Sequence, residues 1–178
     1  MRLSTRSAAG AMLIASACLL AGCAAGAKPE AMVAEKVAVS HQSNGDVSVI
    51  VSGGKATSAV GASQISDDSF AQALRDSITK SGLFKAVSAS GGRYKLTAFI
   101  GKVDQPTMGF SMTVNMEVSY TLVDTESNKT VWSKNIPSSY TAKVSDAFAG
   151  VARLRLANEG AAKANIQEAI TAMGALQL

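Results

Sequence analysis

The chain has 178 residues, the size of one small domain, which excludes a multidomain enzyme. Hydrophobic side chains make up 47% of it and aromatic side chains only 5%, so the core must be largely aliphatic. Two cysteines and one histidine leave little material for metal sites or thiol chemistry. The formal net charge of +4 falls to +2 if the first 22 residues are removed. A domain with that charge and no basic run gives no indication of nucleic-acid binding.

The N-terminal segment has the three parts of an export signal. Arg2 and Arg6 form a basic start, residues 7–20 are uncharged and mostly apolar, and small residues lead to Cys23. The last four letters, LAGC, resemble the lipobox of bacterial lipoproteins. That resemblance implies a signal peptide over residues 1–22 and a lipidated Cys23 carrying palmitate-type acyl chains. The alternatives are a membrane-spanning helix over residues 7–27 and an ordinary signal cut after Ala21 or Ala25.

Lipidation would place the protein in the cell envelope. The residue after Cys23 is Ala24, whereas Asp at this position resembles a retention signal for the inner membrane in enterobacterial lipoproteins. We therefore expect an anchor in the outer membrane, with the protein on its periplasmic face. The Ala-rich residues 23–44 are expected to form a tether, and residues 45–178 a periplasmic α/β domain.

The first predicted elements are a strand and a helix. Valines alternate with other residues from Asp46 to Ser52, which is typical of a strand with one buried face. A helix is predicted over residues 66–81, with Ser66 as its N-cap and Gly82 as a left-handed C-cap. Ile65 before the cap and Phe70 after it fit a hydrophobic staple.

Three strands and a second helix follow. Strands are predicted over residues 94–100, 110–122 and 131–136, with Pro137 interrupting the last strand or placing it at an edge. Residues 146–176 are predicted to be helical, with Ser145 as a possible N-cap and a possible break at residues 155–158. The expected fold is a single α+β domain of β-α-β-β-β-α order. Its sheet would be mainly antiparallel, with two helices packed on one face.

No motif predicts catalysis, a metal or a cofactor. His41 lies in a polar stretch without a second histidine, and we expect it to be a solvated loop residue. Residues 53–57 lack the spacing of a phosphate-binding loop, so a turn is expected there. Arg155, Glu159 and Lys163 follow one another at intervals of four, which is typical of a solvated helix face. The chain is therefore not expected to be an enzyme.

Two features could contact a partner. Pro106 and Met108 lie in a predicted turn with apolar side chains, and they are our candidate contact residues. An exposed strand at the sheet edge could also accept a partner strand.

The pattern as a whole resembles several small envelope lipoproteins. The stretch FAQAL from Phe70, followed by SGLF from Ser81 and a Tyr-x-Leu strand, resembles a pattern of periplasmic lipoproteins. The element order over residues 45–176 is similar to lipoproteins of lipopolysaccharide assembly, curli secretion and penicillin-binding-protein activation. The resemblance implies a non-enzymatic adaptor in outer-membrane assembly or transport, anchored in the membrane by its lipid, whose partner is an envelope protein or a glycolipid. The alternatives are a carboxylate-dependent enzyme acting on an envelope saccharide or lipid, and a purely structural lipoprotein.

Overall fold

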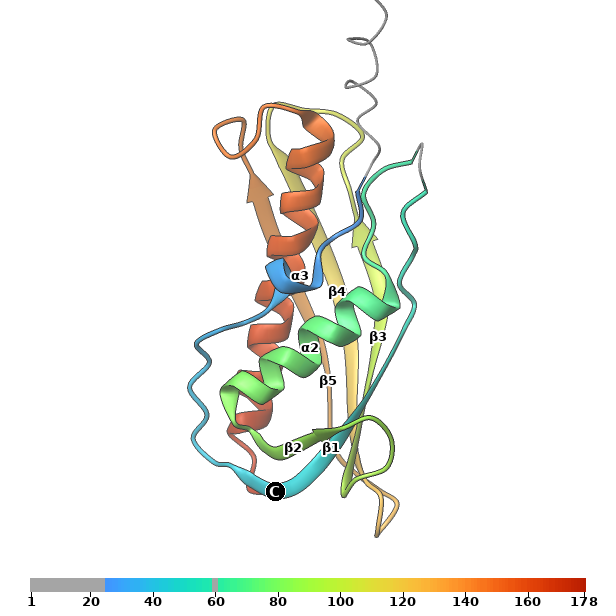
Figure 1. Cartoon of the computed structure of the whole chain (residues 1–178), viewed down its shortest axis with the longest axis vertical. Coiled ribbons are helices and arrows are strands. Elements are labelled where there is room, and N and C mark those ends of the chain that lie inside the picture. Colours follow the sequence, from blue (N-terminus) through green and yellow to red (C-terminus); the bar gives the residue numbers. More distant parts are fainter. Residues whose placement is uncertain (1–24, 59–60) are drawn as a thin grey trace, which may run out of the picture.

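The computed structural model describes residues 25–58 and 61–178 (Figure 1). The sequence signals for export and lipidation, including Cys23, lie outside these residues. The described elements are α1 (Pro29–Met32), β1 (Ser43–Ser52), α2 (Asp67–Ser81), β2 (Phe84–Ser88), β3 (Tyr94–Asp104), β4 (Met112–Asp124), β5 (Lys129–Ala142) and α3 (Gly150–Gly174).

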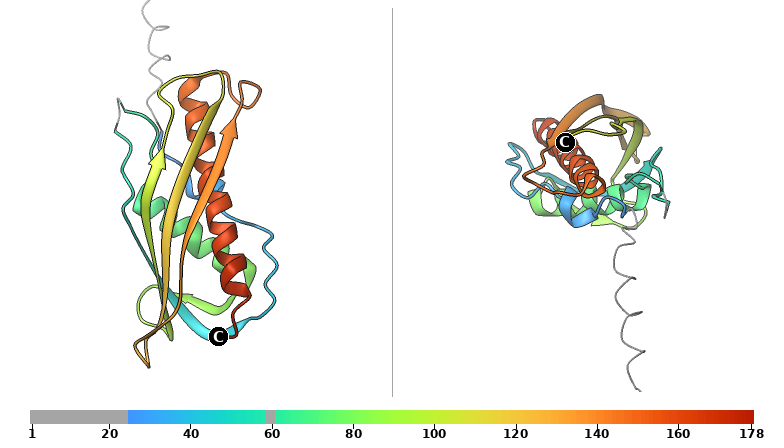
Figure 2. Two further views of the ribbon diagram at one scale, coloured as in Figure 1. Left: turned by 180° about the vertical axis from the view of Figure 1, so that it is seen from behind. Right: turned by 90° about the horizontal axis from the view of Figure 1, so that it is seen from above.

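One five-stranded sheet, in the order β2-β1-β3-β4-β5, carries the helices on one face (Figure 2). The predicted α+β class and the packing of the helices on the sheet are confirmed. The sheet is mixed, because β1 runs parallel to β2 and β3 while β4 is antiparallel to both of its neighbours. The strand β2 was not predicted, since its five residues are too few to show a clear alternation.

The strand β4 has the two faces that its sequence predicts. Its inward residues are at most 5% exposed: Met112, Val114, Met116, Val118, Tyr120 and Leu122. The strand was predicted to begin at Phe110, which is wrong, because β4 begins at Met112 and Phe110 is 87% exposed. The strand β5 continues through Pro137 and is an edge of the sheet, where a missing backbone N–H is tolerated.

The predicted ends of α2 are confirmed. The Ser66 hydroxyl accepts a hydrogen bond from the Ser69 backbone N–H at 3.2 Å, a cap that contributes about 1 kcal/mol. Gly82 closes the helix in the left-handed conformation, with φ of 66°. Ile65 and Phe70 are both buried, as a hydrophobic staple requires.

The helix α3 runs from Gly150 to Gly174 without a break at residues 155–158, where the sequence left its continuity open. Ser145 is not its N-cap, because the cap position is Ala149. Gly160, which weakens a helix in isolation, is required here for packing. A Cβ at this position would overlap the ring of Tyr140 on β5, so tertiary contact selects glycine.

The folded part begins earlier than the sequence predicts. Residues expected to form a tether over 23–44 instead enter the core, where they are at most 4% exposed: Ala27, Met32, Val33 and Ala34. The Ala34 N–H donates to the buried Ser77 hydroxyl of α2 at 2.9 Å. We call residues 27–34 the strap, because they lie across α2 and α3 and tie both helices together.

Candidate binding groove

A groove of about 480 Å³ lies at the end of the molecule where β3 passes into β4. Its walls are the β3–β4 connection and the first turn of α3. The lining is mostly apolar and includes Pro106, Met108, Met112, Val151 and Leu154. The structure thus places both predicted contact residues, Pro106 and Met108, in one groove. The groove also contains residues of α3, and the sequence did not predict that these lie beside Pro106 and Met108.

Arg153 holds the groove together from inside. Only 7% of this residue is exposed, and its guanidinium donates to the carbonyl oxygens of Ala147 at 2.9 Å and of Gly109 at 3.1 Å. A third bond goes to the carbonyl oxygen of Phe148. Because these acceptors come from both connections, one buried cation fixes the two loops against each other. Within the described part of the chain, Arg153 forms no ion pair, so its role is that of a brace.

The start of the β3–β4 connection is fixed by a buried polar network. The Gln105 side-chain amide donates to the Asn158 side-chain oxygen and to the Ser63 carbonyl oxygen, both at 2.8 Å. Asn158, fully buried on α3, also donates to the Ser63 carbonyl at 2.9 Å. Buried amides that are satisfied in this way hold a loop in one conformation. The groove is therefore largely formed before any ligand arrives.

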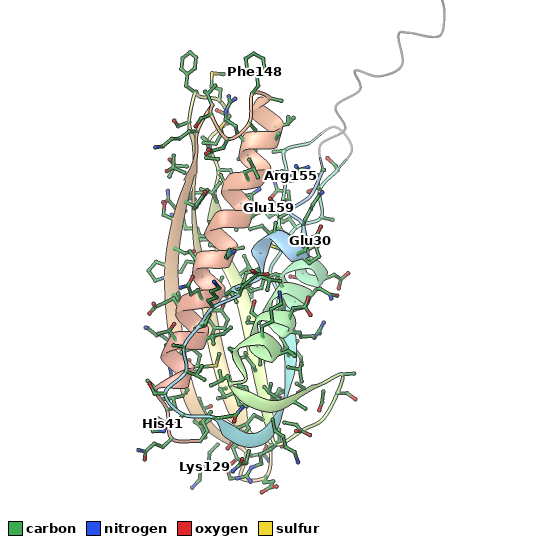
Figure 3. The ribbon with its side chains drawn as sticks, turned by 60° about the vertical axis from the view of Figure 1, so that its left-hand side comes forward. Glu30, His41, Lys129, Phe148, Arg155 and Glu159 are labelled. Carbon is green, nitrogen blue, oxygen red and sulfur yellow. The ribbon has the colours of Figure 1, made fainter. Side chains whose placement is uncertain are left out.

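The predicted solvated face of α3 is partly wrong. Glu159 is 4% exposed and accepts a hydrogen bond from the Lys28 backbone N–H of the strap at 3.0 Å, and Arg155 lies 3.5 Å from the same carboxylate oxygen. Burial raises the pKa of Glu159 above its usual range. The carboxylate thus attaches the strap to α3 (Figure 3). It also lines a hollow of about 520 Å³ with Lys163 and Tyr140.

Three further acidic residues line a hollow or close a turn. Asp104 and Glu117 line a hollow of about 420 Å³, where Asp104 pairs with Lys102 at 2.7 Å and both side chains are more than half exposed. Asp67 accepts the Gly54 N–H at 2.7 Å and so closes the turn after β1. Over residues 25–58 and 61–178, the structure holds no cluster of three or more metal-ligating side chains.

His41 lies at the other end of the molecule from Phe148 and the groove (Figure 3). It is exposed, as expected for a solvated loop residue, and its backbone N–H donates to the Gly174 carbonyl oxygen. In the described part of the chain, no helix combines the length and the apolar character needed to cross a bilayer.

Comparison with known proteins finds structures of similar fold but identifies no family. No family model and no curated protein matches the chain. Among solved structures, a Xanthomonas campestris protein of family DUF330 aligns with a TM-score of 0.60 at 14% identity, over 82% of this chain and 90% of its own. A candidate lipoprotein from Caulobacter crescentus aligns with a TM-score of 0.51 at 14% identity, over 72% and 87%.

A third neighbour is the PelC dodecamer from Paraburkholderia phytofirmans, with a TM-score of 0.50 at 15% identity, over 79% of this chain and 92% of its own. At these identities the likeness concerns architecture. The predicted similarity to proteins of lipopolysaccharide assembly, curli secretion or penicillin-binding-protein activation finds no support in these matches. The chain shares its α+β fold with a set of bacterial proteins that includes a candidate lipoprotein.

Proposed function

We propose that this protein is a lipid-anchored, non-enzymatic adaptor of the bacterial envelope. Its anchor is the acylated Cys23, and its domain lies on the periplasmic face of the outer membrane, in keeping with Ala24 at the following position. The architecture shared with a candidate lipoprotein supports this assignment at the level of fold.

The observation that carries the proposal is the shortness of the link between Cys23 and the folded domain. Ala27 is 4% exposed, and its N–H donates to the Gln64 carbonyl oxygen at 2.9 Å. Only three residues lie between Cys23 and Ala27, and these four Cα–Cα steps allow a reach of at most about 14 Å. An anchored domain would therefore stay against the membrane surface, whereas a tether over residues 23–44 would let it move away.

The same end of the domain carries the groove. Gln64 donates through its side chain to Gln105 at 3.2 Å, and Gln105 directly precedes Pro106. The partner that fits is an envelope protein or a glycolipid at the membrane surface, whose apolar part contacts Pro106 and Met108. A groove lined by methionine and aliphatic side chains suits such a ligand, because methionine adapts to irregular apolar shapes.

Radiolabelled palmitate tests the anchor. We expect the wild-type protein to carry the label and to be found in the membrane fraction of lysed cells. The Cys23→Ser protein should carry no label. Labelling of the Cys23→Ser protein would overturn the lipidation.

Photo-crosslinking in intact cells tests the partner. A photoreactive amino acid in place of Met108 should capture an envelope protein or glycolipid. The matched control is the same amino acid in place of Lys129, which is exposed at the opposite end of the molecule (Figure 3). Identical products from both positions, or none from Met108, would count against a partner in the groove.

A further inference from the structure

Exposed apolar side chains gather around the mouth of the groove. Met108 is 81% exposed, Phe110 87%, Phe148 92% and Val151 51%. We call these four residues the apolar tip. Val151 is about half covered, as are Ile50 and Phe99 on the strands, whereas the other three members of the tip are nearly bare. Two nearly bare phenylalanines on adjacent loops are costly in water, so they indicate a surface that is covered in the cell.

The segments around the apolar tip carry few charges. Residues 61–66, 105–116 and 147–152 contain no Asp, Glu, Lys or Arg, whereas Lys143 and Asp146, earlier in the β5–α3 connection, are exposed. The guanidinium of Arg153 is buried and points into the loops, where backbone carbonyls accept hydrogen bonds from its Nη1 and Nη2 atoms. A protein partner commonly meets charged and polar groups at the rim of an interface. An end with few charges and protruding aromatic side chains fits the acyl region of a bilayer better. Of the two partners proposed for the groove, this position favours a glycolipid of the same bilayer.

The point at which the chain enters the domain determines which surface of the domain lies near the proposed anchor. The first described residues lead to Ala27, whose N–H donates to the Gln64 carbonyl oxygen. The Gln64 side chain in turn donates to Gln105, at the start of the β3–β4 connection. The start of the described chain and the connections before β4 and before α3 lie toward one end, with the C-terminus at the other (Figure 1). If Cys23 carries acyl chains, as the proposed function holds, the bilayer lies within about 14 Å of Ala27.

We propose that the apolar tip inserts into the lipid bilayer that holds the anchor, with Phe110 and Phe148 reaching its acyl region. The anchor and the tip then form two separate attachments, which fix the orientation of the domain on the membrane. The buried Arg153 brace keeps the two phenylalanine-bearing loops together, so that both enter the bilayer as one rigid wedge. The long axis of the sheet would point away from the membrane (Figure 2).

Spin labels on the intact lipidated protein test this insertion. The sequence has cysteine only at positions 18 and 23, so the mature lipidated chain offers no thiol to the label. Phe110→Cys and Phe148→Cys each introduce one site at a position that is already exposed. The matched control is Phe99→Cys, since Phe99 is 50% exposed on the far face of the sheet.

The labelled proteins are inserted into vesicles of phosphatidylethanolamine and phosphatidylglycerol. Collision rates are then measured with oxygen, which concentrates in the bilayer, and with a water-soluble nickel complex. We expect oxygen to dominate at positions 110 and 148 and the nickel complex to dominate at position 99. Nickel collisions at all three positions would overturn the insertion. So would spin–spin broadening at 110 and 148 that grows with protein density, because a second copy would then cover the tip.

The wild-type protein separates this inference from the proposed function on which it rests. If wild-type protein takes up the spin label, Cys23 is free, the anchor is absent, and both proposals fail. If wild-type protein stays unlabelled and bound to the vesicles while labels at 110 and 148 remain in water, the anchor stands and only the insertion fails.

Discussion

The carboxylate of Asp124 closes the connection between β4 and β5. One oxygen accepts the backbone N–H groups of Glu126 at 3.0 Å and Ser127 at 3.1 Å. The other accepts a hydrogen bond from the Arg93 guanidinium at 2.8 Å. The Arg93 bond is the main cause that holds the pKa of Asp124 at about 2, well below its usual value of 3.8.

This shift predicts a loss of stability in acid. A depressed carboxyl pKa stabilises the fold above the unfolded value and loses that contribution as pH falls from 3.8 toward about 2. We expect Asp124→Asn to be less stable than wild type at pH 6, with the difference shrinking below pH 3. Urea unfolding at several pH values measures this. The control is Glu126→Gln, whose carboxylate meets the same Arg93 at 3.1 Å but is 71% exposed. An equal acid dependence in both variants would contradict the assignment to Asp124.

At the scale of elements, α3 is attached to the sheet by buried polar groups as well as by apolar packing. Asn165 is fully buried on α3 and accepts the Tyr120 hydroxyl of β4 at 2.8 Å. It also donates to the Ile136 carbonyl oxygen of β5 at 2.7 Å. Burial raises the pKa of Tyr120, which keeps the phenol protonated and able to donate. One side chain thus joins three elements.

Removing that side chain should be costly. We expect Asn165→Ala to lower the free energy of unfolding by about 2–4 kcal/mol, because the Tyr120 hydroxyl and the Ile136 carbonyl would be buried without partners. Tyr120→Phe removes one of the two groups that share the bond. The double variant should therefore be less destabilised than the sum of the single changes by about 1 kcal/mol. Strict additivity in urea unfolding would show that the Tyr120–Asn165 bond contributes no coupling.

At the scale of the whole molecule, the strap sets how far the domain could stand from the anchor proposed at Cys23. Glu159 holds the strap by accepting the Lys28 N–H, and its pKa is raised mainly by burial. A raised carboxyl pKa favours the fold below the unfolded value, and that stabilisation is lost as pH rises through the folded value.

Replacing the charge should therefore change the pH dependence. Glu159→Gln keeps an acceptor oxygen and removes the buried charge. We expect this variant to gain stability relative to wild type as pH rises from 4 to 7. Glu159→Ala, which removes the acceptor as well, should be less stable than Glu159→Gln at every pH and should expose residues 27–34 to limited proteolysis. If Glu159→Gln follows the wild-type pH curve, burial does not control this carboxyl.

Local signals explain which parts of the fold could be predicted. The alternation of Met112 to Leu122 on β4, the Ser66 cap and the Gly82 terminus of α2 depend on residues a few positions apart. Such signals stand in the sequence itself. The strand β2 and the continuity of α3 past Gly160 depend instead on distant neighbours, β1 and Tyr140, so local propensity did not show them.

The same distinction between local signals and distant contacts applies to the candidate site. The sequence by itself pointed to Pro106 and Met108 as uncovered apolar residues, and it predicts an export signal and an anchor at Cys23. Only the tertiary structure brought the β3–β4 connection against α3 through Arg153 and Asn158, over separations of 44 and 53 residues. Only the structure placed Ala27 in the core, four residues from Cys23. Burial against residues far along the chain decides both features, and no short pattern records it.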